Sequence, residues 1–592
     1  MNFTVKPKII SGIILWVAVF LTFVPMPGTS PMLVSDDMLY IGTWARLDLT
    51  LENIIYYFKT PILFLHSPLV MVTFMADKLI WGKSMVYGSG AVNAMLHAAS
   101  AVLFFTLLDM LHFYRRGKTS LRIPVLISLF AAFLWAVHPQ RAESVAWICE
   151  RKDCLVAIFF LGASVSFIRS FRKHKYDIAG TVMLALSFMC KPMLITFPAA
   201  GAVFIYAETQ GRGWQKKLKY LIPSTAVSLI YFVINMTQVG KSVSGNRLLD
   251  MERCAEIFAN IGRYCGKTFY PADLCTLYPE KLPLSDMWYW LILLLPLVFL
   301  LFEKSRKYVI YAFLPCILLF LGILAPVSGI IPIGASDFAD RYSYVPSLFL
   351  VTAAVFAAAL AADKYKRVQA PLVGVMAVLA LFSVVEVRLV AENYRDEKKF
   401  LENSIAVKNP HWRNLFSYGH RLIYEKRYVE AYDFAEKFAI PPDCNEGRKR
   451  AYNVFKTSLK SLAQIYLGDV ENGLCLLDSV LFSKDCAYVR DVSLGFARDT
   501  MNIAAKLHLQ RGNIKKAAHI FGMLSDLYGE FVPAERDFCL GVRAMILRNY
   551  PEAVIHFGRL AEKYPEEQRI IANYQEARRR AGMAERQASG KK

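Results

Sequence analysis

The sequence predicts an all-α membrane protein, in which about eleven transmembrane helices over residues 1–391 precede a domain of helical repeats over residues 392–592. The first observation behind this is composition: 55% of the 592 residues are hydrophobic and the mean hydropathy is +0.34, whereas soluble domains are about 45–50% apolar. The second is a series of long apolar runs, and the third is their end near residue 391. These features exclude a disordered chain, a fibrous repeat and a single small domain.

The apolar runs set the predicted spans. The first follows Lys6 and Lys8 and lacks a small-x-small cleavage site, so we expect an uncleaved anchor rather than a signal peptide. A further apolar stretch, 61–75, contains His66-Ser67-Pro68 and is expected to be re-entrant or interfacial. The runs long enough to cross roughly 30 Å of hydrocarbon cover about 8–27, 89–110, 123–138, 154–168, 178–190, 193–207, 220–236, 287–302, 308–327, 344–362 and 370–391.

The net charge of +21 suggests either nucleic-acid binding or membrane topology, and its distribution favours topology. Five short loops (111–122, 169–177, 208–219, 303–307 and 363–367), with the two N-terminal lysines, carry a net +16. The other loops and the spans total −2, and the tail totals +7. We therefore predict a multi-pass protein of the cytoplasmic (inner) membrane with a cytoplasmic N-terminus. The neutral loops, called the outward loops below, and the C-terminal domain would face the periplasm, and no nucleic-acid partner is expected.

The C-terminal domain contains a loose repeat. Ala431, Gly473, Ala517 and Ala553 follow helix-like segments at intervals of 42, 44 and 36 residues, and small residues there would let paired helices approach closely. The pattern is similar to tetratricopeptide repeats, whose period is about 34 residues, although generic helical hairpins are the alternative. Such a solenoid typically binds proteins or peptides in its groove. The 11 cysteines include no CxxC pair, so the sequence does not indicate thiolate metal ligation.

Polar residues gather where the outward loops meet the spans. Asp36 and Asp37 are adjacent carboxylates just outside the first span, and they suit a general base or a cation site. A simple helix N-cap is the alternative. The segment from His138 to Asp153 carries six charges. It fits either a sugar- and phosphate-binding surface, because Trp stacks on sugars and Arg binds phosphate, or an interfacial helix.

Three further cations lie in such positions. Lys191 stands among apolar residues at a span boundary, where it either snorkels or meets an anionic head group. Lys267 lies among aromatic residues, and Arg341 belongs to an Asp-Arg-Tyr triplet. In the derived topology these cations share one side of the membrane with Arg151 and the two aspartates. This arrangement suits an enzyme that uses a lipid-phosphate donor outside the cytoplasm, because cations stabilise a phosphate leaving group and a carboxylate takes the proton of the attacking hydroxyl.

Several motifs, in order, resemble one known family. HPQRAESVAWICERKDCL, CKPMLITFP, YCGKTFYPADLCTLYP and FADRYSYVPS, with AVNAMLHAASAVLFF before them, resemble the membrane part of the transmembrane and tetratricopeptide-repeat O-mannosyltransferases and their bacterial relatives. The resemblance covers most of residues 30–360. It implies the GT-C glycosyltransferase fold, whose members take a sugar from a polyprenyl phosphate and usually invert the anomeric centre.

The resemblance also implies roles for individual residues. Asp36 would be the catalytic base, and Asp37 would orient the acceptor or share that role. The implied contacts to the donor phosphate are Arg341, Lys191, Lys267 and Arg151, and the implied sugar or acceptor contacts are His138, Glu143, Trp147 and Tyr342. The chain departs from its relatives at His66-Ser67-Pro68, where they often have an Arg-Pro or Tyr-Pro pair. The sugar is not fixed, and a divalent cation at the carboxylate pair is left open.

The leading hypothesis is transfer of a sugar from a polyprenyl-phosphate donor to a Ser or Thr hydroxyl of an exported protein. A second hypothesis keeps the chemistry and makes the acceptor a lipid or a cell-surface glycan. A third is a non-enzymatic scaffold that recruits partners through its repeats, but a scaffold gains nothing from charges buried near lipid. A transporter would instead place paired charges within its spans.

Overall fold

The structure is a computed structural model, and it divides the chain into two compact units, Met1–Val407 and Lys408–Lys592. This boundary lies 16 residues beyond the predicted one at 391/392, because α18 (Glu397–Ile405) belongs to the first unit. The residues described are 5–589 apart from 27–35, 43–44, 63–64, 112–113, 117–118, 122–124, 240–250, 280–281, 331–337, 366, 368, 408–409, 441–443, 445, 489–493 and 530–532.

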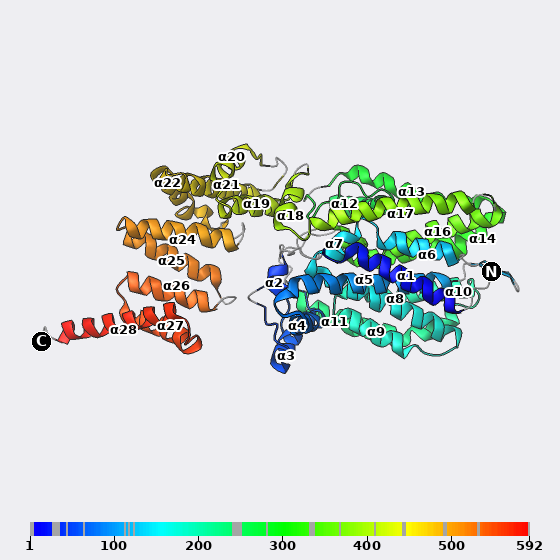
Figure 1. Cartoon of the computed structure of the whole chain (residues 1–592), viewed down its shortest axis with the longest axis horizontal. Helices are drawn as coiled ribbons and strands as arrows, with labels where there is room; N and C mark the ends of the chain where they lie inside the picture. Colours follow the sequence, from blue (N-terminus) through cyan, green and yellow to red (C-terminus); the bar gives the residue numbers. More distant parts are fainter. Residues whose placement is uncertain are drawn as a thin grey trace. The chain divides into compact units, whose positions relative to one another are not determined.

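The first unit is a bundle of apolar helices (Figure 1). Each predicted apolar run coincides with a helical segment, and seven segments are long and apolar enough to cross a membrane within the described residues. Four more carry apolar stretches of 10–17 residues. The predicted all-α, multi-pass fold is therefore confirmed. The helices are α1 (Val5–Phe23), α4 (Pro68–Trp81), α5 (Met85–Met110), α6 (Val125–Ala136), α8 (Arg151–Arg172), α9 (Ile178–Phe188), α10 (Phe197–Thr209), α11 (Ile222–Val239), α13 (Trp290–Leu294), α14 (Glu303–Tyr308), α15 (Leu314–Leu324), α16 (Ser347–Lys364) and α17 (Gln369–Glu392). Between them lie the 3₁₀ turns η1 (Gly82–Ser84), η3 (Pro192–Thr196), η4 (Gln215–Leu221), η5 (Leu284–Tyr289), η6 (Leu295–Leu301) and η8 (Ala325–Val327). The π-turn η7 (Val309–Phe313) precedes α15.

The stretch 61–75 contributes the first part of α4. The helix begins at Pro68, since proline suits the first turn of a helix, and it ends at Gly82, whose positive φ of +51° reverses the chain. Asp77 then accepts a hydrogen bond from Ser89 at 2.6 Å, so α4 folds back onto the start of α5. Trp81 lies against Gly88, where a larger residue would collide with its ring.

Shorter elements lie at the ends of the bundle. In Figure 1 the start of α1 lies at the opposite end of this unit from α2 and α7. At the end near the start of α1, Lys8 forms an ion pair with Asp109 at 2.7 Å and Arg172 pairs with Glu208 at 2.7 Å. The shorter elements of the unit are α2 (Asp37–Ile41), α3 (Leu51–Lys59), the hairpin of β1 (Tyr114–Arg116) and β2 (Thr119–Leu121), α7 (Arg141–Ala146), η2 (Ile148–Glu150) and η9 (Asp340–Ser343), and the unit also contains the longer helix α12 (Met251–Phe269).

The second unit consists of paired helices. A residue with positive φ lies in the turn of each of four hairpins: Lys426, Gly468, Gly512 and Arg548. The predicted anchor residues Ala431, Gly473, Ala517 and Ala553 are buried. The assignment to tetratricopeptide repeats stays a prediction. The helices are α19 (Trp412–Tyr424), α20 (Tyr428–Lys437), α21 (Glu446–Tyr466), α22 (Val470–Leu481), the 3₁₀ turn η11 (Lys484–Tyr488), α24 (Leu494–Gln510), α25 (Ile514–Tyr528), α26 (Pro533–Ile546), α27 (Tyr550–Lys563) and α28 (Gln568–Ser589).

The small anchor residues predict a stability effect. Ala553 is fully buried in the cluster that includes Phe557 and Leu560, so Ala553→Leu would overpack the helix pair and cost about 1–3 kcal/mol. We expect a lower unfolding midpoint for the second unit in the full chain, measured by limited proteolysis against temperature. Ala572→Leu, at an exposed position on α28, is the matched control. Equal midpoints for the two variants would contradict close packing at Ala553.

Candidate functional site

The predicted carboxylate pair lies against the segment between α7 and α8. Asp37 is fully buried, and its Oδ1 accepts a hydrogen bond from the Cys149 backbone N–H at 2.8 Å. Asp36, one residue earlier, is half-buried. One helical turn later on the same face of α2, the ring centroid of Tyr40 lies 5.1 Å from the ammonium of Lys152. The tertiary structure therefore holds α2 on the turn that opens α8.

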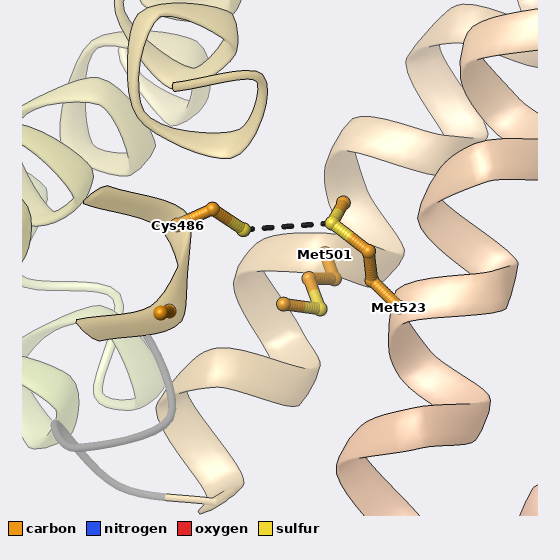
Figure 2. Close-up of a pocket in the computed structure, with 4 residues that line it drawn as sticks. Cys486, Met501 and Met523 are labelled. Carbon is orange, nitrogen blue, oxygen red and sulfur yellow. Dashed lines mark hydrogen bonds between the residues drawn. The ribbon is translucent and has the colours of Figure 1, made fainter. Parts of the chain in front are cut away.

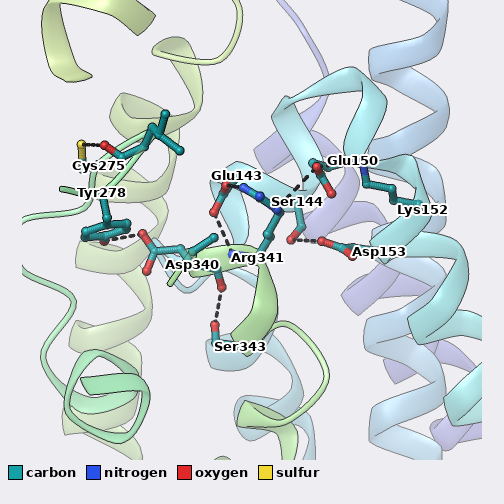
Figure 3. Close-up of polar contacts among 12 residues, drawn as sticks. Glu143, Ser144, Glu150, Lys152, Asp153, Cys275, Tyr278, Asp340, Arg341 and Ser343 are labelled. Atoms are coloured by element: carbon teal, nitrogen blue, oxygen red, sulfur yellow. Dashed lines mark hydrogen bonds and ion pairs between the residues drawn. The ribbon is translucent and has the colours of Figure 1, made fainter. Parts of the chain in front are cut away.

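Arg341 is the centre of an ion-pair network next to this turn (Figure 3). Its backbone N–H donates to Glu143 Oε2 at 2.7 Å, and its guanidinium pairs with Glu143 Oε1. The Arg341 Nε also lies 3.6 Å from Glu150 Oε1. The guanidinium carbon lies 5.7 Å from the ring centroid of Trp147 and 5.0 Å from that of Tyr342. One short 3₁₀ turn, η9, thus joins four predicted site residues: Arg341, Tyr342, Glu143 and Trp147.

Two lysines extend the network. Lys152 pairs with Glu150 at 3.0 Å, and Lys191 pairs with Asp153 at 2.7 Å. Lys191 also lies 5.2 Å from the ring centroid of Tyr342. Figure 3 shows Glu150, Lys152 and Asp153 on the segment that faces Arg341. With Glu143 and Arg341, the network holds three carboxylates and three cations. The free-energy cost of removing these charges from water is therefore offset by ion pairing.

Burial shifts the ionisation of the Glu143–Arg341 pair. Removal from water raises the pKa of Glu143 to about 7, although Arg341 opposes the rise. Burial lowers the pKa of Arg341, but Glu143, Tyr342 and Glu150 outweigh it and hold that pKa well above its ordinary value. Glu143 therefore takes up a proton within the physiological range, while Arg341 stays cationic.

This shift predicts a pH dependence of stability. Between pH values of about 4.5 and 7, Glu143 is protonated in the folded protein and ionised in the unfolded chain. The folded state then binds more protons, so its stability falls as the pH rises through this window. We expect Glu143→Gln to flatten the dependence of the unfolding midpoint on pH between 5 and 7, as followed by thermal scans in detergent. Glu52→Gln, at an exposed site, should leave the slope as in the wild type, and an unchanged slope in Glu143→Gln would contradict the assignment.

Asp340, the residue before Arg341, accepts hydrogen bonds from two different segments, an arrangement called the Asp340 clamp below. Asp340 Oδ2 accepts a hydrogen bond from the Tyr278 hydroxyl at 2.6 Å, and Asp340 Oδ1 accepts one from Gln140 Nε2 at 3.1 Å. Burial and the neighbouring Asp340 raise the pKa of Tyr278 well above its ordinary value, which keeps the phenol a donor. These contacts fix η9 and with it the position of Arg341.

Two further predicted site residues, Lys267 and His138, form hydrogen bonds in turns near Asp340. Lys267 donates to the carbonyl oxygens of Ala272 at 2.6 Å and Asp273 at 3.2 Å, and it lies 5.2 Å from the ring centroid of Tyr278. It therefore closes the turn after α12, next to the Asp340 clamp. His138 lies in the turn before α7, where its Nδ1 accepts the backbone N–H of Gln140 at 3.3 Å.

Arg151 lies in a different environment. It is fully buried, and its guanidinium pairs with Asp77 at 2.5 Å. It also donates to Asn93 Oδ1 at 2.8 Å, the Ser89 carbonyl at 3.0 Å and Thr73 Oγ1 at 3.3 Å. The structure therefore does not bring Arg151 into the Arg341 network; it joins α4, α5 and α8.

Sequence reasoning did not select four charged residues of this region: Asp77, Glu150, Lys152 and Asp340. Asp77 lies within an apolar stretch, and a charge within or beside a span is rarely without a partner, whereas Glu150 and Lys152 belong to a run of charges and Asp340 precedes Arg341. That signal could have found Asp77, whereas the pairing of Glu150 with Lys152 and Arg341 depends on the fold. Among the described residues, no group of three or more His, Cys, Asp or Glu side chains is arranged to hold a metal ion.

Comparison with known proteins identifies similar sequences. The chain is 32% identical over 152 residues to the protein O-mannosyl-transferase TMTC4 of Homo sapiens, which is 24% of this chain and 20% of that protein. It is 31% identical over 152 residues to TMTC3 of Homo sapiens (25% and 15%). It is also 31% identical over 131 residues to Tmtc1 of Drosophila melanogaster (22% and 14%).

The matched segments are short relative to the whole of these proteins. They span a fifth or less of the length of the curated relatives. No protein-family model and no solved structure matches the chain significantly. Over about a quarter of its length, this chain is similar to the TMTC protein O-mannosyl-transferases.

Proposed function

We propose that this protein is a membrane glycosyltransferase that transfers a sugar from a polyprenyl-phosphate donor to a Ser or Thr hydroxyl of an exported protein. The observation that carries the proposal is the contact of α2 with the turn before α8. Through the Asp37–Cys149 hydrogen bond, a carboxylate pair lies beside the segment whose Glu150 pairs with Arg341. A proton acceptor and an anion-binding cation thus lie on adjoining elements.

In this proposal, the half-buried Asp36 is the general base and the buried Asp37 positions it. The acceptor oxygen bonds to the anomeric carbon of the sugar, and the bond from that carbon to the phosphate oxygen breaks. Asp36 takes the hydroxyl proton, and polyprenyl phosphate leaves. A single displacement of this kind inverts the anomeric centre.

Arg341 is the proposed contact for the donor phosphate. Its side chain is 15% exposed, more than those of Lys152 and Lys191 at 8% each. When Glu143 is protonated, the positive charge of Arg341 is no longer fully neutralised and a phosphate oxygen can take the place of the carboxylate. Lys191 and Lys152 add positive charge behind it, and the sugar would lie beside Trp147 and Tyr342, whose rings pack against the Arg341 guanidinium.

The local contacts suggest supporting roles for three other residues. Lys267 and His138 hold the turns on either side of the Asp340 clamp, and Arg151 holds α4 against α8. We propose that all three position the site rather than contact the donor. The C-terminal hairpins, in the proposed periplasmic location, would bind the acceptor protein.

Reconstitution of the full chain in nanodiscs tests this function. Polyprenyl-phosphate mannose, the same lipid with glucose, and GDP-mannose would each be supplied with a pool of exported proteins. We expect label on Ser or Thr from a polyprenyl-phosphate donor and none from the nucleotide sugar. Transfer only to lipid or glycan in the same reactions would favour the second acceptor class, and transfer from GDP-mannose would contradict the donor assignment.

A further inference from the structure

A cavity lined by sulfur lies in the second unit, apart from the residues discussed so far. Its volume is about 280 Å³, and it is lined by Cys486, Ala487, Met501 and Met523. Figure 2 shows the sulfur atoms of Cys486 and Met523 pointing toward each other, with Met501 nearby, and the three residues come from η11, α25 and α24 respectively. These residues are 15 and 22 positions apart in sequence, so only the packing of the helices brings them together.

The sulfur atoms of Cys486 and Met523 are spaced as two ligands of one ion would be. Cys486 Sγ lies 3.5 Å from Met523 Sδ. Metal–sulfur bonds are about 2.3 Å long, so two sulfurs on one ion at an angle near 100–120° lie about 3.5–4 Å apart. Met501 is 1% exposed and lines the same cavity.

The chemistry of the lining selects the class of ion. The lining contributes three sulfur-bearing side chains and an alanine, and no charged side chain. Thiolate and thioether ligands favour Cu(I), whereas Ca²⁺, Mg²⁺ and Mn²⁺ prefer oxygen. One thiolate with two thioethers also matches the charge of a monovalent ion, since the bound unit is neutral.

We propose that Cys486, Met501 and Met523 form a binding site for one Cu(I) ion. Binding releases the thiol proton of Cys486 to solvent and forms three copper–sulfur bonds. The ion enters as Cu(I), so no electron is transferred. Because η11, α24 and α25 meet at the site, bound copper would tie two helical hairpins together and stabilise the second unit.

The test uses the purified full-length chain in detergent, with Cu(I) supplied as its bicinchoninate complex under anaerobic, ascorbate-reduced conditions. We expect the wild type to withdraw one equivalent of Cu(I) and to unfold at a higher temperature when it is loaded. Cys486→Ser, and Met501→Leu with Met523→Leu, should each weaken binding by at least about tenfold, because loss of even an outer-shell partner costs about 10–100-fold.

The controls use sulfur residues outside the cavity. Cys475→Ser removes an exposed thiol on α22, and Met583→Leu removes an exposed thioether on α28. Neither should alter Cu(I) binding. Leucine retains the volume of methionine, so the Met variants separate ligation from packing. Wild-type affinity in Cys486→Ser, loss of binding in Cys475→Ser, or a stronger preference for Zn²⁺ than for Cu(I) would overturn the assignment.

Discussion

Asp36→Asn is expected to lower the turnover number for sugar transfer by about 10²–10⁴-fold, the usual contribution of a general base. Asparagine has nearly the same shape but cannot accept the hydroxyl proton. Because Asp36 is half-buried, its replacement should leave the unfolding midpoint close to that of the wild type. The measurement is the initial rate with a labelled polyprenyl-phosphate sugar at saturating acceptor.

Variants of Asp37 are expected to lose stability, whereas variants of Asp36 are expected to lose catalytic rate. Its Oδ1 accepts the Cys149 N–H inside the protein, so Asp37→Ala would leave a buried donor unpaired at a cost of about 1–3 kcal/mol. Asp37→Asn keeps an oxygen acceptor and should be milder. Asp48→Asn is the matched control, because Asp48 is an exposed carboxylate that pairs with Lys78. Near wild-type turnover in Asp36→Asn would show that the base lies elsewhere.

Arg151→Met is expected to have the largest effect on stability. Asp77 would lose the cation that lies 2.5 Å away in the buried interface of α4 and α8, and an unpaired buried charge costs about 3–5 kcal/mol. We expect little monomeric protein after extraction, measured by size-exclusion chromatography and thermal aggregation. Arg46→Met should cost far less, because Arg46 and Glu52 form an exposed pair at 3.9 Å.

A double variant tests the role of Arg151. Arg151→Met with Asp77→Asn removes both charges, and such replacements of a buried pair are often nearly neutral in stability. We expect the double variant to fold and to transfer sugar with a KM for the donor close to that of the wild type. A folded double variant with a strongly raised donor KM would instead indicate that Arg151 contacts the phosphate, as the family resemblance implies.

Much of the fold could be predicted because it follows from local chemistry. Apolar runs must form helices in a membrane, where each backbone polar group needs a partner within its own segment. Repeated small residues such as Ala517 and Ala553 likewise indicated paired helices before any contact was known. The start of α4 at Pro68 was harder to predict from the sequence. The return of α4 onto α5 depends on the turn at Gly82 and on the hydrogen bond from Ser89 to Asp77.

In the candidate site, too, some features could be predicted from the sequence and others depend on the tertiary structure. The sequence by itself determined the all-α multi-pass class, the charged segments at the span ends and the resemblance to O-mannosyltransferases, because composition and residue order carry that information. Only the tertiary structure decided that Arg341 pairs with Glu143 and Glu150, that Arg151 belongs with Asp77 instead, and that Cys486 contacts Met523 and lines one cavity with Met501. The physical reason is range: helix formation and hydropathy depend on neighbouring residues, whereas the partner of a buried charge is chosen by helix packing and can lie about 200 residues away in the chain.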